Sequence, residues 1–181
     1  LPFQSWWILI YVSSFVFWPL CYVMTAKYNS KEFFFRFVTA DLLSRTICGI
    51  FFIVLPTTNV RPQFAVSGFC DWLLALIYQV DLPYDLFPSI HCLVSWFCFL
   101  AVKGQKKIPI WYKAVSFILA VLVFLSTLFT KQHVIVDVAG GIFLAQGCFW
   151  IGKHTEIWHI YEHIGNKIEK AITKYIEGKT K

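Results

Sequence analysis

Long apolar stretches separated by short polar segments run through almost the whole chain. Five of them cover residues 6–24, 33–56, 90–102, 108–129 and 134–151. A helix needs about 20 residues to cross the hydrocarbon core of a bilayer. Four stretches are long enough, and we expect the third to reach this length by extending back through Pro88. A shorter stretch, 64–80, contains Asp71 and Gln79, which predicts a re-entrant, interfacial or half-buried helix.

The composition agrees with a membrane protein, because 58% of the 181 residues are hydrophobic, 19% are aromatic and only 14% are charged. No basic segment with a small-residue cleavage site precedes Trp6, so we expect the first stretch to be a membrane helix; a further helix upstream of residue 1 is left open. The predicted fold is all-α: a polytopic membrane helical bundle of about five transmembrane helices over 1–152, with a basic amphipathic tail over 153–181.

Lysines and arginines mark one side of this predicted bundle. Five spans would bring three basic regions to the same side of the membrane: Lys27, Lys31 and Arg36; Lys103, Lys106 and Lys107; and Lys153, Lys167, Lys170, Lys174, Lys179 and Lys181. The positive-inside rule makes that side cytoplasmic. The extracytoplasmic side then receives Arg61, Asp71, Asp81, Asp85, His91, Lys131 and His133. We expect an integral plasma-membrane protein with an extracytoplasmic site and a cytoplasmic C-terminus.

Two histidines at the ends of apolar stretches are candidates for chemistry. His133 and Asp137 are four residues apart, so on a helix the carboxylate can orient the imidazole and leave its other nitrogen as a nucleophile or base. His91 begins another span on the same side, and Ser89 lies near first-turn N–H groups that favour an anion. Arg61 offers a planar fork suited to phosphate. Together these residues predict a phosphoryl-transfer site.

The same residues resemble the motifs of the type 2 phosphatidic acid phosphatase superfamily of membrane lipid phosphatases and phosphotransferases. Pro88-Ser89-Ile90-His91 is similar to PSGH, the run from Ser126 through His133 to Asp137 matches SRxxxxxHxxxD, and Arg61-Pro62 is similar to the end of KxxxxxxRP. The resemblance covers roughly residues 56–141. Each motif is weak alone, but the ordered trio is specific.

The resemblance implies roles for these residues. His133 would attack phosphorus to form a phosphohistidine, and Asp137 would orient it. His91 would protonate the departing oxygen, after which water or another acceptor would release the phosphoryl group. Arg61 and Ser89 would bind phosphate. Neither a metal nor another cofactor is implied.

Two positions depart from the family pattern. Val54 stands where the first motif has lysine, and Thr127 stands where the third has arginine. Lys131 is the local candidate to replace these phosphate-binding cations, although a lysine at a membrane edge commonly snorkels to the headgroups. The third motif is more similar to the branch of inositolphosphotransferase-like and sphingolipid-synthase-like proteins. The lipid substrate, and hydrolysis versus transfer, therefore stay open.

Simpler interpretations apply to several other polar residues. Asp41 and Arg45 are expected to form an ion pair within one helix. Asp71, Asp81 and Asp85 flank the mouth of the site, where solvated loop carboxylates are the expected interpretation. The six cysteines form no CxxC and no zinc spacing, so we expect neither a structural disulfide nor cysteine catalysis.

The tail from 156 to 181 has isoleucines and tyrosines at helical spacing with lysines between them, which predicts an amphipathic helix on the cytoplasmic membrane surface. His159 and His163 are spaced for a metal pair, but surface histidines are the preferred interpretation, and no metal site is expected. The topology accounts for the lysines behind the net charge of +6, so nucleic-acid binding is not expected.

The sequence therefore predicts a metal-independent lipid phosphate phosphatase that acts on phosphatidic acid, phosphatidylglycerophosphate or a polyprenyl pyrophosphate. One alternative is a phospholipid headgroup phosphotransferase of the inositolphosphotransferase or sphingolipid-synthase kind. The other is a non-catalytic membrane protein that binds lipid or a protein partner. The trio His91, His133 and Asp137 favours an enzyme, because a binding protein would not need it. Protein partners are left open.

Overall fold

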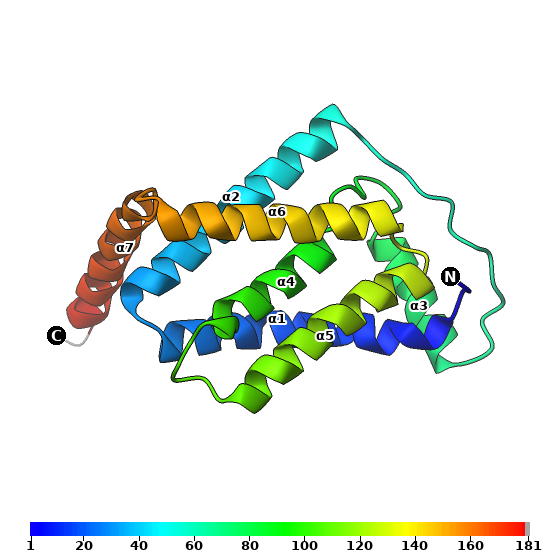
Figure 1. Cartoon of the computed structure of the whole chain (residues 1–181), viewed down its shortest axis with the longest axis horizontal. Coiled ribbons are helices and arrows are strands. Elements are labelled where there is room, and N and C mark those ends of the chain that lie inside the picture. The colour runs from blue at the N-terminus through cyan, green and yellow to red at the C-terminus, as the bar shows by residue number, and fades with distance from the viewer. Residues whose placement is uncertain (180–181) are drawn as a thin grey trace.

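The computed structural model describes residues 1–179, and the regular secondary structure in this part of the chain is entirely helical, with no strand. A 3-10 turn, Ser5–Trp7, precedes seven α-helices: α1 (Ile8–Tyr28), α2 (Lys31–Val54), α3 (Phe69–Val80), α4 (Ile90–Lys103), α5 (Ile110–Phe129), α6 (Ile135–His154) and α7 (Trp158–Lys179). The predicted all-α bundle is confirmed. Figure 1 shows α3 beside the N-terminus and α7 at the opposite end of the bundle.

Four segments are long and apolar enough to cross a membrane among the residues described: Ser5–Tyr28, α2, α5 and α6. The fifth expected span is shorter. Helix α4 has 14 residues, or about 21 Å of helix, and the predicted extension through Pro88 is wrong. Ser89 is the N-cap of α4, and its side chain accepts the backbone N–H of Cys92 at 3.4 Å. Proline lacks the N–H that a longer helix would require at residue 88.

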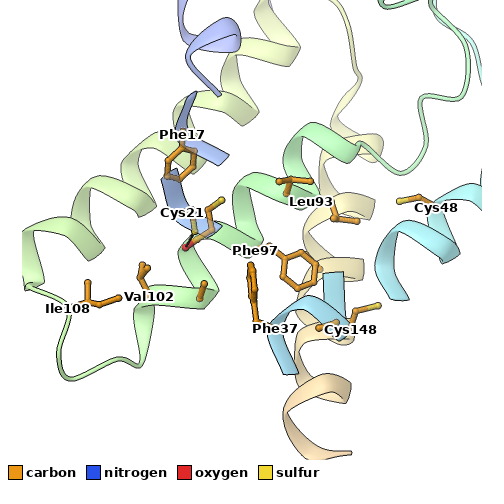
Figure 2. Packing of buried hydrophobic residues seen from close by; sticks show 14 residues of the cluster. Phe17, Cys21, Phe37, Cys48, Leu93, Phe97, Val102, Ile108 and Cys148 are labelled. Atoms are coloured by element: carbon orange, nitrogen blue, oxygen red, sulfur yellow. Dashed lines mark hydrogen bonds between the residues drawn. The ribbon is translucent and has the colours of Figure 1, made fainter. Parts of the chain in front are cut away.

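Other helices enclose α4, so it does not need the length of a helix that faces lipid. Its side chains pack between α1, α2, α5 and α6, and nine of its residues are buried. Figure 2 shows Phe97 of α4 against Phe37 of α2, with ring centroids 5.9 Å apart and the rings near perpendicular at 77°. All six cysteines are free, and five of them are buried as small apolar side chains.

Helix α3 begins later than the sequence pattern suggests. Residues 64–68 are not helical, and α3 starts at Phe69. Its buried residue, Leu74, packs in one cluster with Ile8 and Tyr11 at the start of α1. This packing holds α3 against the start of α1, so the residues that follow α3 lie at the end of the bundle where α1, α4 and α6 begin.

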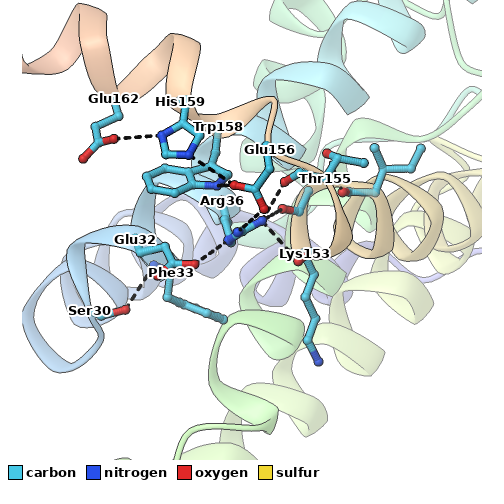
Figure 3. A network of polar contacts seen from close by, with 12 residues as sticks. Ser30, Glu32, Phe33, Arg36, Lys153, Thr155, Glu156, Trp158, His159 and Glu162 are labelled. Carbon is cyan, nitrogen blue, oxygen red and sulfur yellow. Dashed lines mark hydrogen bonds and ion pairs between the residues drawn. The ribbon is translucent and has the colours of Figure 1, made fainter.

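The ion pair expected inside α2 is confirmed. Arg45 Nε lies 2.9 Å from Asp41 Oδ2, and Asp41 is only 5% exposed. Arg36, a second cationic residue of α2, was expected only to mark the cytoplasmic side of the membrane. Arg36 donates to the carbonyl oxygens of Lys153 at 3.2 Å and Thr155 at 2.6 Å, and to the carboxylate of Glu156 at 2.9 Å, as Figure 3 shows. A cation at these carbonyls complements the C-terminal end of the α6 dipole.

Helix α7 is the amphipathic helix that the tail pattern predicts. Ile160, Ile164, Ile168 and Ile172 are exposed along it. At its start, Trp158 is buried and lies 5.1 Å from the Arg36 guanidinium carbon. The tail residue Lys181 lies outside the described residues.

We expect Arg36→Ala to lower the thermal midpoint of unfolding in detergent by roughly 2–4 °C, because the α6 carbonyls and Glu156 lose their donor. Hydrogen bonds from Arg36 and Trp158 lower the pKa of Glu156 below its ordinary value of 4.5. A lowered carboxyl pKa stabilises the fold above pH 4.5 and loses that contribution as the pH falls through the folded value. The midpoint difference between wild type and variant should therefore shrink on acidification. An equal difference at every pH would contradict the Glu156 contribution.

Candidate functional site

The turn that ends α5 positions His133. Lys131 adopts a φ of 56°, the N–H of Lys131 donates to Leu128 O at 3.3 Å, and the N–H of Gln132 donates to Thr127 O at 2.9 Å. This is the Schellman pattern of helix termination, which usually uses glycine at the left-handed position. The N–H of His133 donates to the same Thr127 carbonyl at 3.1 Å. The end of α5 thus holds the His133 backbone directly.

The first turn of α6 provides the partner of His133. The imidazole Nδ1 lies 3.3 Å from Asp137 Oδ2, as the four-residue spacing predicted. The same carboxylate oxygen accepts the N–H of Val134 at 3.0 Å. His133 is 7% exposed and Asp137 is 4% exposed. Because Asp137 engages Nδ1, the Nε2 atom of His133 is the nitrogen left for chemistry.

The start of α4 is attached to α6 at this point. The N–H of Ser89 donates to Asp137 O at 3.0 Å. A Cβ at Gly141 would lie 2.5 Å from Ser89 O, so the two helices approach closely only because residue 141 has no side chain. This approach brings the His91 ring centroid to 5.9 Å from that of His133.

Ser89 and Arg61, both expected at phosphate, have different positions. Ser89 is fully buried, and its Oγ caps α4 through Cys92. Arg61 Nη1 donates to Tyr78 O at 3.2 Å and to Asp81 O, and its guanidinium carbon lies 4.4 Å from the Tyr78 ring. The buried Nε and Nη2 atoms of Arg61 have no partner among the described residues. These two donors are unsatisfied, although both atoms are almost inaccessible to solvent.

Two cavities meet at His133. The larger, about 670 Å³, is lined by Leu1, Asn59, Val60, Arg61, Pro62, Leu128, Lys131, His133, Val134, Ile135 and Val136. The smaller, about 230 Å³, is lined by Phe52, Asp81, Tyr84, Asp85, Leu86, Ile90, His91 and His133. A group bound in the first cavity and a group bound in the second would both reach the imidazole of His133.

The positions that depart from the family motifs supply no cation. Val54, at the end of α2, is 75% exposed. Thr127 is fully buried, and its Oγ1 donates to Phe124 O at 2.8 Å. Lys131 lines the larger cavity with Arg61, and its Nζ donates to Leu1 O.

We expect Lys131→Gly to keep the thermal midpoint of the wild type, because glycine adopts the left-handed conformation without the strain of a side chain. If Lys131 binds phosphate, KM should rise about tenfold, the size of one charge-assisted hydrogen bond. Steady-state kinetics in detergent measure the change in KM, and Lys131→Arg is the control variant that retains the charge. An unchanged KM would show that the lysine only contacts the headgroup region.

Two residues at the site, Tyr11 and Asp81, belong to none of the sequence motifs. The hydroxyl of Tyr11 donates to Asp81 Oδ2 at 2.9 Å and lies 2.6 Å from His91 Nε2. Asp81 was expected to be a solvated loop carboxylate; it is half-buried directly after α3, and it also accepts the Tyr11 hydroxyl. Asp71 differs, since it is half-buried and its carboxylate accepts hydrogen bonds from the N–H and hydroxyl of Ser67. No local pattern could connect Tyr11 with His91, which is 80 residues away.

Side chains of His, Cys, Asp and Glu occur throughout the described residues. No group of three or more His, Cys, Asp or Glu side chains there could hold a metal ion. His159 is exposed and lies 3.2 Å from carboxylate oxygens of both Glu156 and Glu162, as a surface histidine.

Comparison with known proteins gives one result. No curated protein and no solved structure gives a significant match. The sequence profile of the PAP2 superfamily matches residues 2–151, from the segment before α1 to the last turn of α6. This match includes every residue described at the two cavities except Leu1. The chain therefore belongs to the type 2 phosphatidic acid phosphatase (PAP2) superfamily.

Proposed function

We propose that this protein is a metal-independent membrane phosphatase that hydrolyses a phosphomonoester or pyrophosphate lipid through a phosphohistidine on His133. Membership of the PAP2 superfamily supports phosphatase chemistry on a lipid phosphate. The observation that carries the proposal is the buried His133–Asp137 pair opposite His91, where the two cavities meet.

In the first step the phosphate binds in the larger cavity, where Arg61 and Lys131 line the wall and supply positive charge. Nε2 of His133 attacks phosphorus, and its Nδ1–H stays hydrogen bonded to Asp137. The bond from phosphorus to the leaving oxygen breaks, and that oxygen takes a proton from His91. In the second step His91 accepts a proton from water as the water attacks phosphorus. Inorganic phosphate leaves and His133 is regenerated.

The walls of the larger cavity support a lipid substrate. Val134, Ile135 and Val136 line it beside the reacting imidazole, and each is at least 49% exposed. An alkyl chain can lie against such a surface while the phosphate reaches Arg61.

The membrane orientation is part of the proposal. Basic residues gather at the C-terminal ends of α1, α4 and α6 and along α7. The two cavities lie at the N-terminal ends of α1, α4 and α6. The positive-inside rule then gives an extracytoplasmic active site and a cytoplasmic C-terminus. A plasma-membrane location is proposed on the same basis.

A headgroup phosphotransferase is the second candidate. The smaller cavity, which His91 and His133 share, is lined by Asp81, Tyr84 and Asp85. Carboxylates and a phenol can accept hydrogen bonds from a polyol or an amino alcohol. Such an acceptor would replace water in the second step.

The test is phosphate release by the purified protein in detergent with EDTA. Phosphatidic acid, phosphatidylglycerophosphate and undecaprenyl pyrophosphate serve as substrates. Release from at least one of them is expected, and the relative rates rank them. Release only when an alcohol is added, together with formation of a new phosphodiester, would support the transferase. No reaction in either assay would indicate a protein that binds lipid or a partner without catalysis.

A further inference from the structure

We propose that Tyr11 and Asp81 form a positioning relay for His91. In this relay Tyr11 holds the Nε2 proton of His91, and Nδ1 is the nitrogen that serves the leaving oxygen. The inference rests on the proposed phosphatase function and assigns two positioning residues to it.

The direction of the hydrogen bonds follows from the chemistry of the three groups. The Tyr11 hydroxyl has one proton and two partners, Asp81 Oδ2 at 2.9 Å and His91 Nε2 at 2.6 Å. An ionised carboxylate only accepts hydrogen bonds, so the hydroxyl proton points to Asp81. The Tyr11 oxygen is then the acceptor for His91, and Nε2 must carry a proton.

This arrangement selects one nitrogen of His91. Its Nε2–H is engaged by Tyr11, and Nδ1 has no hydrogen-bond partner among the described residues. Asp137 selects the opposite nitrogen of His133, because it engages Nδ1 and leaves Nε2 free. One histidine is thus prepared as the nucleophile and the other as the proton donor and acceptor.

Surrounding contacts keep the relay rigid. Tyr11 is 1% exposed and packs with Ile8 and Leu74. Its ring lies 4.6 Å from the His91 ring, centroid to centroid. Arg61 donates to the backbone carbonyl of Asp81, so the motif arginine also anchors the far end of the relay.

The proton balance is complete within the relay. In the first step the leaving oxygen receives the Nδ1 proton as its bond to phosphorus breaks and the bond from phosphorus to His133 forms. His91 is then neutral, with its remaining proton on Nε2 toward Tyr11. In the second step Nδ1 takes a proton from the attacking water as the bond from phosphorus to His133 breaks.

The experiment uses two lipid-like phosphomonoesters that differ in the leaving oxygen. One is dodecyl phosphate, and the other is a 4-nitrophenyl phosphate that carries a dodecyl chain on its ring. An alkoxide needs a proton to leave, whereas a nitrophenolate does not. Tyr11→Phe and Asp81→Asn should lower kcat/KM for dodecyl phosphate about 10- to 100-fold, part of the roughly 10²- to 10⁴-fold that proton transfer supplies. For the aryl substrate, kcat/KM should fall less than about threefold, because departure of the nitrophenolate needs no proton and the later attack of water does not contribute to kcat/KM. His91→Gln should show the same selectivity with a larger loss.

Matched controls lie elsewhere in the fold. Tyr28→Phe changes the same residue type at the other end of α1, and Asp71→Asn changes a carboxylate of α3 whose partner is Ser67. Both should retain wild-type kcat/KM on both substrates. Equal losses on the two substrates in Tyr11→Phe, or no loss, would overturn the relay and leave the phosphatase function intact. A wild-type protein that hydrolyses neither substrate would instead overturn the proposed function, and the relay with it.

Discussion

His133→Ala is expected to abolish phosphate release from every lipid substrate while the helical bundle stays folded. Alanine removes the nitrogen that attacks phosphorus, and a nucleophile that forms a covalent intermediate has no local substitute at this site. We expect kcat to fall by at least about 10⁴-fold, as for the loss of other nucleophiles that act within an oriented pair. Phosphate release in detergent measures the loss, and thermal unfolding measures the fold.

His163→Ala is the matched control, because this histidine is exposed on α7, which lies at the opposite end of the bundle from α3 in Figure 1. It should retain full activity. Labelled substrate should also leave an acid-labile phosphoryl group on the wild type and none on His133→Ala. Normal turnover by His133→Ala would refute the nucleophile assignment.

Asp137→Asn is expected to have the second largest effect. The carboxamide has nearly the shape of the carboxylate and can still accept the Val134 N–H, so the first turn of α6 should stay intact. It carries no negative charge, so it cannot stabilise the positive charge that His133 gains during attack, and it can select the wrong tautomer. We expect kcat to fall about 10²- to 10⁴-fold with little change in KM.

The comparison of Asp137→Asn with Asp137→Ala separates orientation from folding. Alanine removes the acceptor of the Val134 N–H as well as the charge, so this variant alone should lose thermal stability. If Asp137→Asn kept wild-type kcat, Asp137 would be a helix cap and not the orienting partner of His133.

Much of the candidate site could be predicted from short-range spacing. His133 and Asp137 lie on either side of the Val134 N-cap of α6, so the short stretch of chain between them brings their side chains together although His133 itself is not helical. The apolar stretches predicted the helices for a similar reason, since about 20 apolar residues have to satisfy their backbone hydrogen bonds within the membrane. Their bounds shifted by a few residues where local caps, such as Ser30 before α2, decided the ends.

The length of α4 could not be predicted in this way. Apolarity does not distinguish a helix facing lipid from one enclosed by other helices, and the expected extension through Pro88 assumed lipid on all sides. Ser89 shows the same limit, because the motif predicted a phosphate contact and the side chain instead caps α4. Which atoms a serine contacts depends on the neighbours of its helix end.

The sequence contained enough information for the membrane-spanning helices, the all-α class, the superfamily and the pairing of His133 with Asp137, because these depend on interactions within one helix, on residues close together in the chain or on motifs in fixed order. It contained no local signal for the contacts of Tyr11 with Asp81 and His91 or of Arg36 with the end of α6. These contacts join segments 70 or more residues apart, and they exist because packing of the helices brings those segments together.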